Sequence, residues 1–389
     1  MSLRRKFAWI ALICVAGAAF WIASSSTEQA GVSDFAAYWT AAHEVAAGRN
    51  PYDSDAILAA ERRLGFAGNT PLVMRNPPWV IPFVAPLGLF SYEVARRLWF
   101  MICLALVLVS VDWLWRLYAS AHGRVWIGWV VAGMFVPVAT VLAIGQISPL
   151  ILLGIAGFLH FEKKGWYGWA GASALLVTLK PHLVFLFWLA LLLWCLRKKH
   201  WQTLGILAGG LLLASGVAML LDSHIFRQYF ELWGHAAILQ QSNPTPSGAL
   251  GVILKSGGRW IGYAPVILAT AWFLVHWIRA GTQWRWQEQL PILLLVSFVV
   301  TPYAWFFDQA VLLPAILQVA AQWSDLPERK WLWPALIYLG INLLTLEFIA
   351  AHHTFFWYAW TAPAWLLFYL WQRWQNLKPP ATGEAIPSR

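Results

Sequence analysis

Residues 202–221, QTLGILAGGLLLASGVAMLL, form an uncharged and mostly apolar stretch that decides the fold. Its length is close to the roughly 20 residues that a helix needs to cross the hydrocarbon core of a bilayer. Similar runs recur along the chain, which has 389 residues, 60% of them hydrophobic and only 11% charged. A soluble domain of ordinary composition is less apolar than this. We therefore expect an all-α polytopic membrane protein.

Twelve apolar runs can be counted. They cover residues 7–23, 98–115, 125–143, 148–161, 166–179, 181–196, 202–221, 261–279, 289–303, 308–322, 331–348 and 355–372. Several are shorter than about 17 residues, so we expect these to tilt or to end below the membrane surface. We predict about twelve transmembrane helices in a single domain, residues 1–379, followed by a short polar cytoplasmic tail, residues 380–389.

The first run follows the cationic residues 4–6 and is typical of either a transmembrane helix or a signal peptide. We favour an uncleaved helix, because the run is long for a signal-peptide core and residues 23–26 make a poor cleavage site. Twelve crossings place both termini on one side, which we take to be the cytoplasm. The inner loops and tails then hold 17 of the 27 Lys and Arg residues, as the positive-inside rule expects. Residues 24–76 and 222–260 become long outer segments.

Composition also excludes some functions. The formal net charge of +10 raises the question of nucleic acid. The cations lie in short loops between apolar runs, however, without a basic surface interleaved with aromatic residues, so we exclude nucleic acid as a partner. Cys14, Cys103 and Cys195 lie far apart, which argues against a disulfide framework or a thiolate metal site.

The apolar stretch 78–90 is not counted as a crossing. Together with Pro77 it contains four prolines, and it is too short to span comfortably. Counting it would also place the cationic residues 197–199 outside. We predict a re-entrant or interfacial segment, which is tolerated only where it is buried in protein or lines a cavity.

The first outer segment contains signals for two juxtamembrane helices. Ser33 can cap a helix from Asp34 to about Ala47 that Gly48 ends. Asp34 and Tyr38 are four residues apart, so they share a helical face. A second amphipathic helix is predicted from about residue 54 to 64, with Asp53 as its N-cap.

Polar residues at the ends of the apolar runs fall at one membrane depth on the outer side. They are Arg75, Asn76, Gln146, Ser148, Lys180, His182, Asp308, His352 and His353. Polar groups at such positions cost free energy unless they are paired or wet, which makes them candidates for function.

Several short motifs, taken in order, resemble glycosyltransferase family 87. They are SDFAAYW at residues 33–39, GRNPY at 48–52, RNPP at 75–78, GQ at 145–146, KP at 180–181 and TPY at 301–303. The resemblance runs from about residue 30 to 315. This family contains polytopic enzymes of the GT-C class, typified by mycobacterial polyprenol-phosphate-mannose-dependent α-mannosyltransferases. It therefore implies a GT-C-type fold in a bacterial inner membrane, with the active site facing the periplasm.

The resemblance also implies a chemistry. A sugar, with mannose as the expected one, leaves a polyprenyl-phosphate donor and joins a hydroxyl of a glycolipid or glycan acceptor, with inversion and without a metal or cofactor. The carboxylate of the first outer loop acts as the base, which here is Asp34. The alternative is that Asp34 only supports the start of its helix.

Arg75, Lys180 and His182 are candidates for the donor phosphate. Lys180 could instead be an interfacial lysine that snorkels to the membrane surface. Tyr38, Asn76, Gln146, Trp305 and Asp308 are expected to line the substrate cavity. The chain departs from the family pattern at Ser148, where Asn is expected, and at Trp305 and Asp308, where relatives often have a histidine.

Other interpretations of the chain remain open. A transporter or flippase for a lipid-linked sugar would also need cations near a phosphate, although internal repeats and midplane ionisable groups are not evident. A non-catalytic membrane scaffold is a third possibility. Asp53 and Asp55 resemble the metal-binding Asp-x-Asp pair of nucleotide-sugar transferases, but nucleotide sugars are cytoplasmic and Asp53 suits an N-cap.

Overall fold

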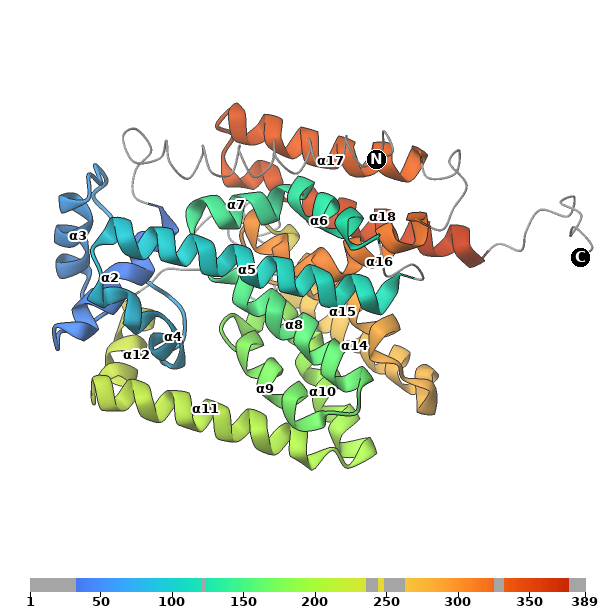
Figure 1. Ribbon diagram of the computed structural model, residues 1–389, viewed down its shortest axis with the longest axis horizontal. Coiled ribbons are helices and arrows are strands. Elements are labelled where there is room, and N and C mark those ends of the chain that lie inside the picture. The colour runs from blue at the N-terminus through green and yellow to red at the C-terminus, as the bar shows by residue number, and fades with distance from the viewer. Residues whose placement is uncertain (1–32, 120–123, 236–243, 248–262, 325–331, 378–389) are drawn as a thin grey trace, which may run out of the picture.

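The computed structural model describes residues 33–119, 124–235, 244–247, 263–324 and 332–377, which contain helices and no strand (Figure 1). The helices are α2 (Asp34–Ala46), α3 (Ser54–Arg63), η1 (Pro78–Val80), α4 (Ile81–Val84), η2 (Ala85–Leu89), α5 (Tyr92–Tyr118), α6 (Val125–Met134), α7 (Val136–Ile144), α8 (Ser148–Lys163), α9 (Tyr167–Val177), η4 (Pro181–Val184), α10 (Phe185–Lys198), α11 (Trp201–Leu221), α12 (Ile225–His235), α14 (Ala264–Ala280), η7 (Gly281–Gln283), α15 (Trp286–Val300), η8 (Phe306–Leu312), α16 (Leu313–Ser324), α17 (Leu332–Ala350), η9 (Phe355–Tyr358) and α18 (Thr361–Leu377). The predicted all-α class is thus confirmed for these residues. The first predicted span, residues 7–23, and the tail 380–389 lie outside them.

Among the residues that the structure describes, five helical segments are long and apolar enough to cross a membrane. They are α5, Pro181–Lys198, α11, Ala264–Gln283 and α17, and the bent pair α6–α7 makes a sixth if its halves form one span. Other apolar helices in the described ranges, such as Tyr167–Val177 and Trp286–Val300, are shorter. The chain therefore has the helices of a membrane protein, whereas the count of twelve spans stays a prediction.

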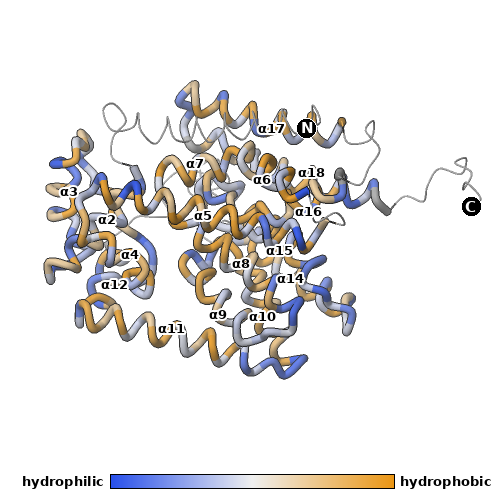
Figure 2. The backbone as a smooth tube through the Cα atoms, viewed as in Figure 1, coloured by the Kyte–Doolittle hydropathy of each residue, from blue (hydrophilic) through white to orange (hydrophobic). Residues whose placement is uncertain are grey.

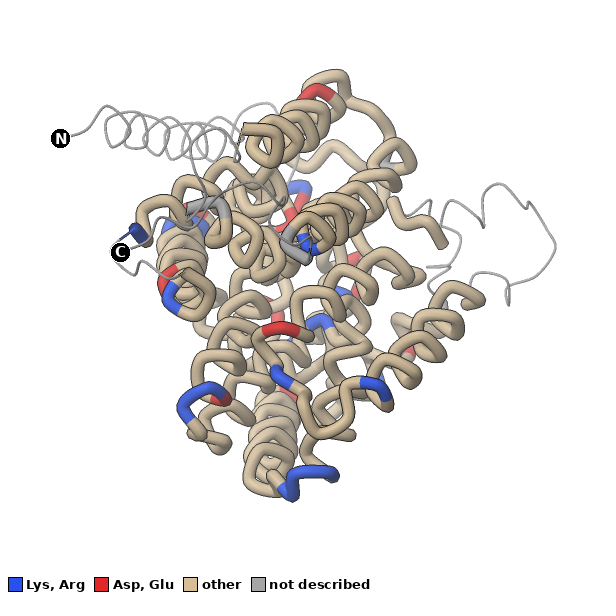
Figure 3. The backbone as a smooth tube through the Cα atoms, turned by 90° about the vertical axis from the view of Figure 1, so that its right-hand side faces the viewer, with Lys and Arg blue, Asp and Glu red and all other residues tan. Residues whose placement is uncertain are grey.

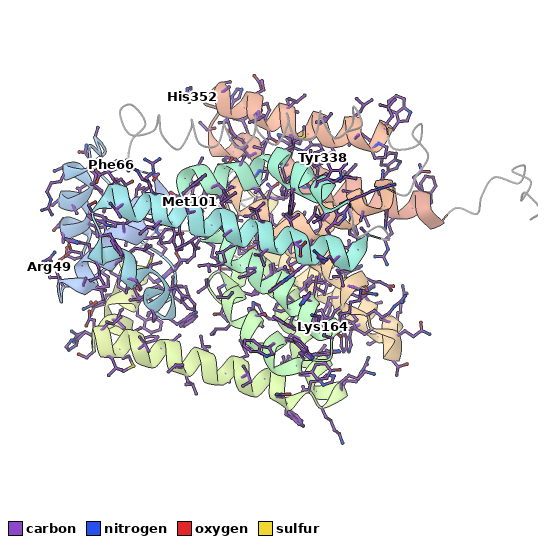
Figure 4. The ribbon with its side chains drawn as sticks, viewed as in Figure 1. Arg49, Phe66, Met101, Lys164, Tyr338 and His352 are labelled. Carbon is purple, nitrogen blue, oxygen red and sulfur yellow. The ribbon has the colours of Figure 1, made fainter. Side chains whose placement is uncertain are left out.

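Hydrophilic segments concentrate towards the two ends of the long axis, whereas α11 and most of α5 are hydrophobic (Figure 2). Arg49 and Phe66 lie towards one end and Lys164 towards the other (Figure 4). Figure 3, which looks along the long axis from the right-hand end of Figure 1, shows basic segments spread over that end. This arrangement fits a bilayer whose normal runs roughly along the long axis of the molecule.

The run 125–143, predicted as one helix, is two helices that meet at an angle of 69°. The break falls at Phe135, just before Pro137, which cannot continue the hydrogen-bond ladder of α6. The Val136 N–H lost from that ladder donates to Asn342 Oδ1 of α17 at 2.8 Å. Tyr338, one turn earlier in α17, donates its hydroxyl to a carbonyl of α6 at 2.7 Å. Because α17 satisfies these groups, the broken helix can sit in an apolar surrounding.

The proline-rich stretch 78–90 folds into three short turns, η1, α4 and η2. Val80, Ile81 and Val84 are fully buried in protein. Turn η2 packs closely on α2, because a Cβ added at Gly88 would lie 2.4 Å from the α2 backbone. The predicted burial is therefore present, while the position of the segment relative to a membrane stays a prediction.

The two helices predicted between residues 34 and 64 are present as α2 and α3, while their position beside a membrane stays a prediction. Helix α2 ends where Gly48 adopts a φ of +69°, and Asp53 caps α3 by accepting hydrogen bonds from two backbone N–H groups. Ser33 is the N-cap residue of α2, as predicted, but its side chain makes no cap hydrogen bond. Only its backbone carbonyl is used, accepting from the Ala36 N–H at 2.8 Å.

Candidate active site

The first turn of α2 carries the predicted base. Asp34 and Tyr38 lie on one face of the helix, as predicted, and both contact the side chain of Gln146. Gln146 Nε2 donates to Asp34 Oδ2 at 2.7 Å, and the Tyr38 hydroxyl donates to Gln146 Oε1 at 2.7 Å. Asp34 is partly exposed, and within the described residues its Oδ1 accepts no hydrogen bond. This oxygen is therefore available to a substrate hydroxyl.

The turn between α7 and α8 brings Gln146 to this position. Gly145 ends α7 with a φ of +72°, and a Cβ added there would lie 2.6 Å from Phe35 Cβ in α2. Only glycine lets the turn approach α2 so closely. The Trp99 indole of α5 donates to the Gly145 carbonyl at 2.8 Å and fixes the turn from the other side.

Lys180 reaches Gln146 from a third element, the turn between α9 and η4. Its ammonium donates to Gln146 Oε1 at 2.9 Å and to Asp308 Oδ1 at 2.6 Å. Two of its three N–H donors are thus used within the described part of the chain. The turn is held by Asn76, whose amide donates to the Leu179 carbonyl at 3.0 Å. Lys180 is buried, so it is not a lysine that snorkels to the membrane surface.

Asp308 lies in η8 and is only 1% exposed. Its Oδ1 also accepts from the Ser148 hydroxyl at 3.1 Å, and its Oδ2 accepts from the Trp305 backbone N–H at 3.2 Å. Ser148 and Trp305, two of the positions at which the chain departs from the family pattern, therefore both contact the third, Asp308, which in turn binds Lys180. Ser148 is one of the polar residues named from the sequence as candidates for function, but no specific role was predicted for it.

Three of the remaining candidates, Arg75, His182 and Trp305, lie next to residues of this cluster or of its turns. Arg75 is partly buried and directly precedes Asn76, which holds the Lys180 turn. His182 is exposed, lies within reach of the charges of Lys180 and Asp308, and has its ring 5.7 Å from that of Tyr303. Trp305 is partly exposed and donates its indole N–H to the Tyr303 hydroxyl at 3.1 Å. His352 and His353 lie apart from these residues, at the end of α17.

The cluster contains two carboxylates and one ammonium, so its net formal charge is −1 when both carboxylates are ionised. Protein atoms surround Asp34 although it keeps some contact with solvent. Burial therefore raises the pKa of its carboxyl, while the Gln146 hydrogen bond and the Lys180 charge lower it and the Asp308 charge raises it. Burial also raises the pKa of Tyr38 well above its ordinary value, so its hydroxyl stays protonated and can donate to Gln146.

The described residues contain no group of three or more His, Cys, Asp or Glu side chains that could hold a metal ion. Asp53 serves as the N-cap of α3, which supports the structural interpretation of the Asp53–Asp55 pair. Two cavities, of about 200 and 490 Å³, lie away from the Asp34 cluster. They share Glu288 and are lined by residues from the α14–α15 turn and from α15, α16 and α18, with no member of the cluster among them.

Comparison with known proteins identifies one family. The model of glycosyltransferase family 87 matches residues 75–302, more than half of the chain. The matched region includes Gln146, Ser148 and Lys180, and it begins at Arg75. Asp34 and Asp308 lie outside it. No curated protein and no solved structure matches the chain.

Proposed function

As a member of glycosyltransferase family 87 the chain is a glycosyltransferase, and we propose that its donor is a polyprenyl-phosphate-linked sugar. The sugar, which we take to be mannose, passes to a hydroxyl of a glycolipid or glycan acceptor. The reaction takes place on the outer face of a bacterial inner membrane, with both termini in the cytoplasm. The uneven distribution of cations between the loops supports this orientation.

In the proposed reaction Asp34 is the general base. The acceptor oxygen attacks the anomeric carbon as the bond from that carbon to the phosphate oxygen breaks, so the configuration inverts. The acceptor proton passes to Asp34, and polyprenyl phosphate leaves. A base needs to be ionised and to have an oxygen within reach of the hydroxyl. The Oδ1 atom of Asp34 accepts no hydrogen bond within the described residues, which supports this role because the oxygen can still accept one from a hydroxyl.

The negative charge that develops on the leaving phosphate is stabilised, in this proposal, by the cationic residues in and beside the same cluster. Lys180 has one N–H donor left beyond its bonds to Gln146 and Asp308, and its position is already fixed by them. A preorganised donor stabilises developing charge without having to reorganise. We assign the second phosphate contact to Arg75, whose guanidinium can bind two oxygens at once. His182 is assigned as a third residue next to the phosphate. These side chains take the place of a metal ion.

The sugar is assigned to the partly exposed rings of Trp305 and Tyr303, because aromatic rings offer an apolar face and polar edges. The observation that carries the whole proposal is the Gln146 amide, which holds Asp34 at one end and Lys180 at the other. A base and a phosphate-binding cation are thereby linked through one side chain.

The test is sugar transfer in proteoliposomes that contain a radiolabelled polyprenyl-phosphate sugar and an acceptor glycolipid. We expect Asp34→Asn to reduce transfer by about 100-fold or more, since general acid–base catalysis typically contributes about 100- to 10,000-fold. Asp55→Asn, which changes an exposed carboxylate in α3, is the matched control and should retain activity. Full turnover by Asp34→Asn would end the assignment. If the wild-type protein moves the intact labelled lipid across the membrane without transferring sugar, the transporter interpretation is favoured. If the wild-type protein shows neither transfer nor lipid movement, the scaffold interpretation is favoured.

A further inference from the structure

We propose that Asp308 is a positioning residue: it holds the Lys180 ammonium against Gln146, and through Gln146 it sets the position of Asp34. This inference rests on the proposed function, because it concerns the residue assigned there as the base. It assigns to Asp308 a role other than lining the substrate cavity.

Asp308 itself is fixed and inaccessible. Lys180 and Ser148 both donate to its Oδ1, and the Trp305 backbone N–H donates to its Oδ2. With 1% of its surface exposed, Asp308 cannot reach a substrate without breaking these bonds. Its 2.6 Å bond to Lys180 joins two buried side chains, and such a pair stays in place because separating it would leave an uncompensated charge in the interior.

Lys180 in turn determines which end of the Gln146 amide faces Asp34. An ammonium can only donate, so the atom that it contacts has to be the amide oxygen. The Ile147 backbone N–H, which also can only donate, points to the same oxygen at 3.2 Å. The amide nitrogen is therefore left for Asp34, to which it donates at 2.7 Å. A reversed amide would place its oxygen against the carboxylate, which is repulsive.

The four side chains thus form a line, Asp308–Lys180–Gln146–Asp34, that joins η8, the α9–η4 turn, the α7–α8 turn and α2. The charged groups that act on Asp34 are Lys180, which favours its ionised form, and Asp308, which disfavours it. Tyr38 lies on the same helix and contacts the shared amide oxygen. Because Lys180 and Asp308 carry opposite charges, removing one of them should shift the pKa of Asp34 in the opposite direction from removing the other.

The experiment compares pH profiles of the transfer rate for variants in proteoliposomes. Asp308→Asn removes the negative charge that raises the pKa of Asp34, so this pKa should fall and the acidic limb of the pH–rate profile should move to lower pH. Removing the ammonium in Lys180→Met should move that limb to higher pH. Both variants should also lose about 10-fold or more in rate at the optimum, as expected when a catalytic group is misplaced, while the donor KM changes less in Asp308→Asn than in Lys180→Met.

A merely structural role would reduce the amount of active protein and leave the limb of the remaining activity unmoved in both variants, and this result would overturn the proposal. If Asp308→Asn does not fold, the double variant Lys180→Met/Asp308→Asn leaves no unpaired buried charge. Its limb should move to higher pH, because Lys180 contacts Gln146, the direct partner of Asp34, whereas Asp308 contacts this amide only through Lys180. An unmoved limb would again refute the proposal. Asp34→Asn distinguishes a failure of the proposed function from a failure of the role of Asp308. If Asp34→Asn keeps full activity, the proposed function fails. If Asp34→Asn is inactive but the acidic limbs of the Asp308→Asn and Lys180→Met profiles do not move, only the positioning role of Asp308 is refuted.

Discussion

The Lys180–Asp308 pair should dominate the polar contribution to stability in this region, and Lys180→Met tests this directly. The two side chains are 11% and 2% exposed, so the pair is not screened by solvent. Removing one partner of a buried pair costs about 3–5 kcal/mol. Asp308 keeps the hydrogen bonds from Ser148 and from the Trp305 backbone, so we expect the lower end, about 3 kcal/mol.

Restoring charge balance should recover most of this loss. In Lys180→Met/Asp308→Asn neither charge remains, and we expect the double variant to lie within about 1 kcal/mol of the wild type. The resulting coupling energy between the two positions would be at least about 2 kcal/mol. The measurement is the free energy of unfolding in mixed micelles as the denaturing detergent fraction increases, applied to all four proteins.

The matched control is another ion pair of the same chain, Arg116–Asp112, whose side chains are 54% and 28% exposed. Arg116→Met should leave the unfolding free energy unchanged within error, because exposed pairs contribute little. If the effects of Lys180→Met and Asp308→Asn simply add in the double variant, the two groups are not an energetic pair and the reasoning is refuted.

Three other predictions concern the elements that position the site. Gly145→Ala should destabilise by about 2–4 kcal/mol, because both its positive φ and its contact with α2 oppose a side chain; Gly48→Ala, with a similar φ but open space, should cost only about 1 kcal/mol in the same unfolding assay. Asn342→Ala leaves the backbone N–H at the α6–α7 break without its acceptor and should cost about 1–3 kcal/mol, and an unchanged unfolding free energy would show that the break needs no support from α17. The transfer rate should fall with decreasing pH along a limb above the ordinary Asp pKa of about 3.9, since the base is active when ionised and burial raises the pKa of Asp34; a limb at or below that value would contradict the burial argument.

Local signals in the sequence were sufficient for the first outer segment. Gly48 ends α2 and Asp53 caps α3 because these effects depend on the backbone conformation of a few neighbouring residues. The four-residue spacing of Asp34 and Tyr38 likewise fixes their common face. Ser33 stands at the predicted N-cap position, but its side chain makes no cap hydrogen bond, since a side chain suited to a cap can still take another orientation.

Contacts between distant elements could not be predicted in the same way. The sequence places Lys180 and Asp308 on the same side of the membrane, but their pairing across 128 residues depends on how η8 packs beside the α9–η4 turn. The break between α6 and α7 has a local signal in Pro137. Its stability, however, depends on Asn342, which lies 206 residues from the group that it satisfies.

The roles of the site residues illustrate the same limit. The predicted topology places Gln146 and Asp308 at the depth of Asp34, which suggested two cavity residues. The hydrogen bonds show in addition that Gln146 lies between Asp34 and Lys180, and that Asp308 binds Lys180 from the other side. Side-chain orientation, which separates a residue that meets a substrate from one that holds its neighbour, is decided by packing rather than by position along the chain.

The most direct measurement of the central claim is single-turnover sugar transfer together with donor binding in the same preparation of Asp34→Asn. We predict that the variant binds the polyprenyl-phosphate sugar within about 3-fold of the wild-type affinity and transfers the sugar at least about 100 times more slowly. Transfer within a few-fold of the wild-type rate would show that Asp34 is not the base and would contradict the account.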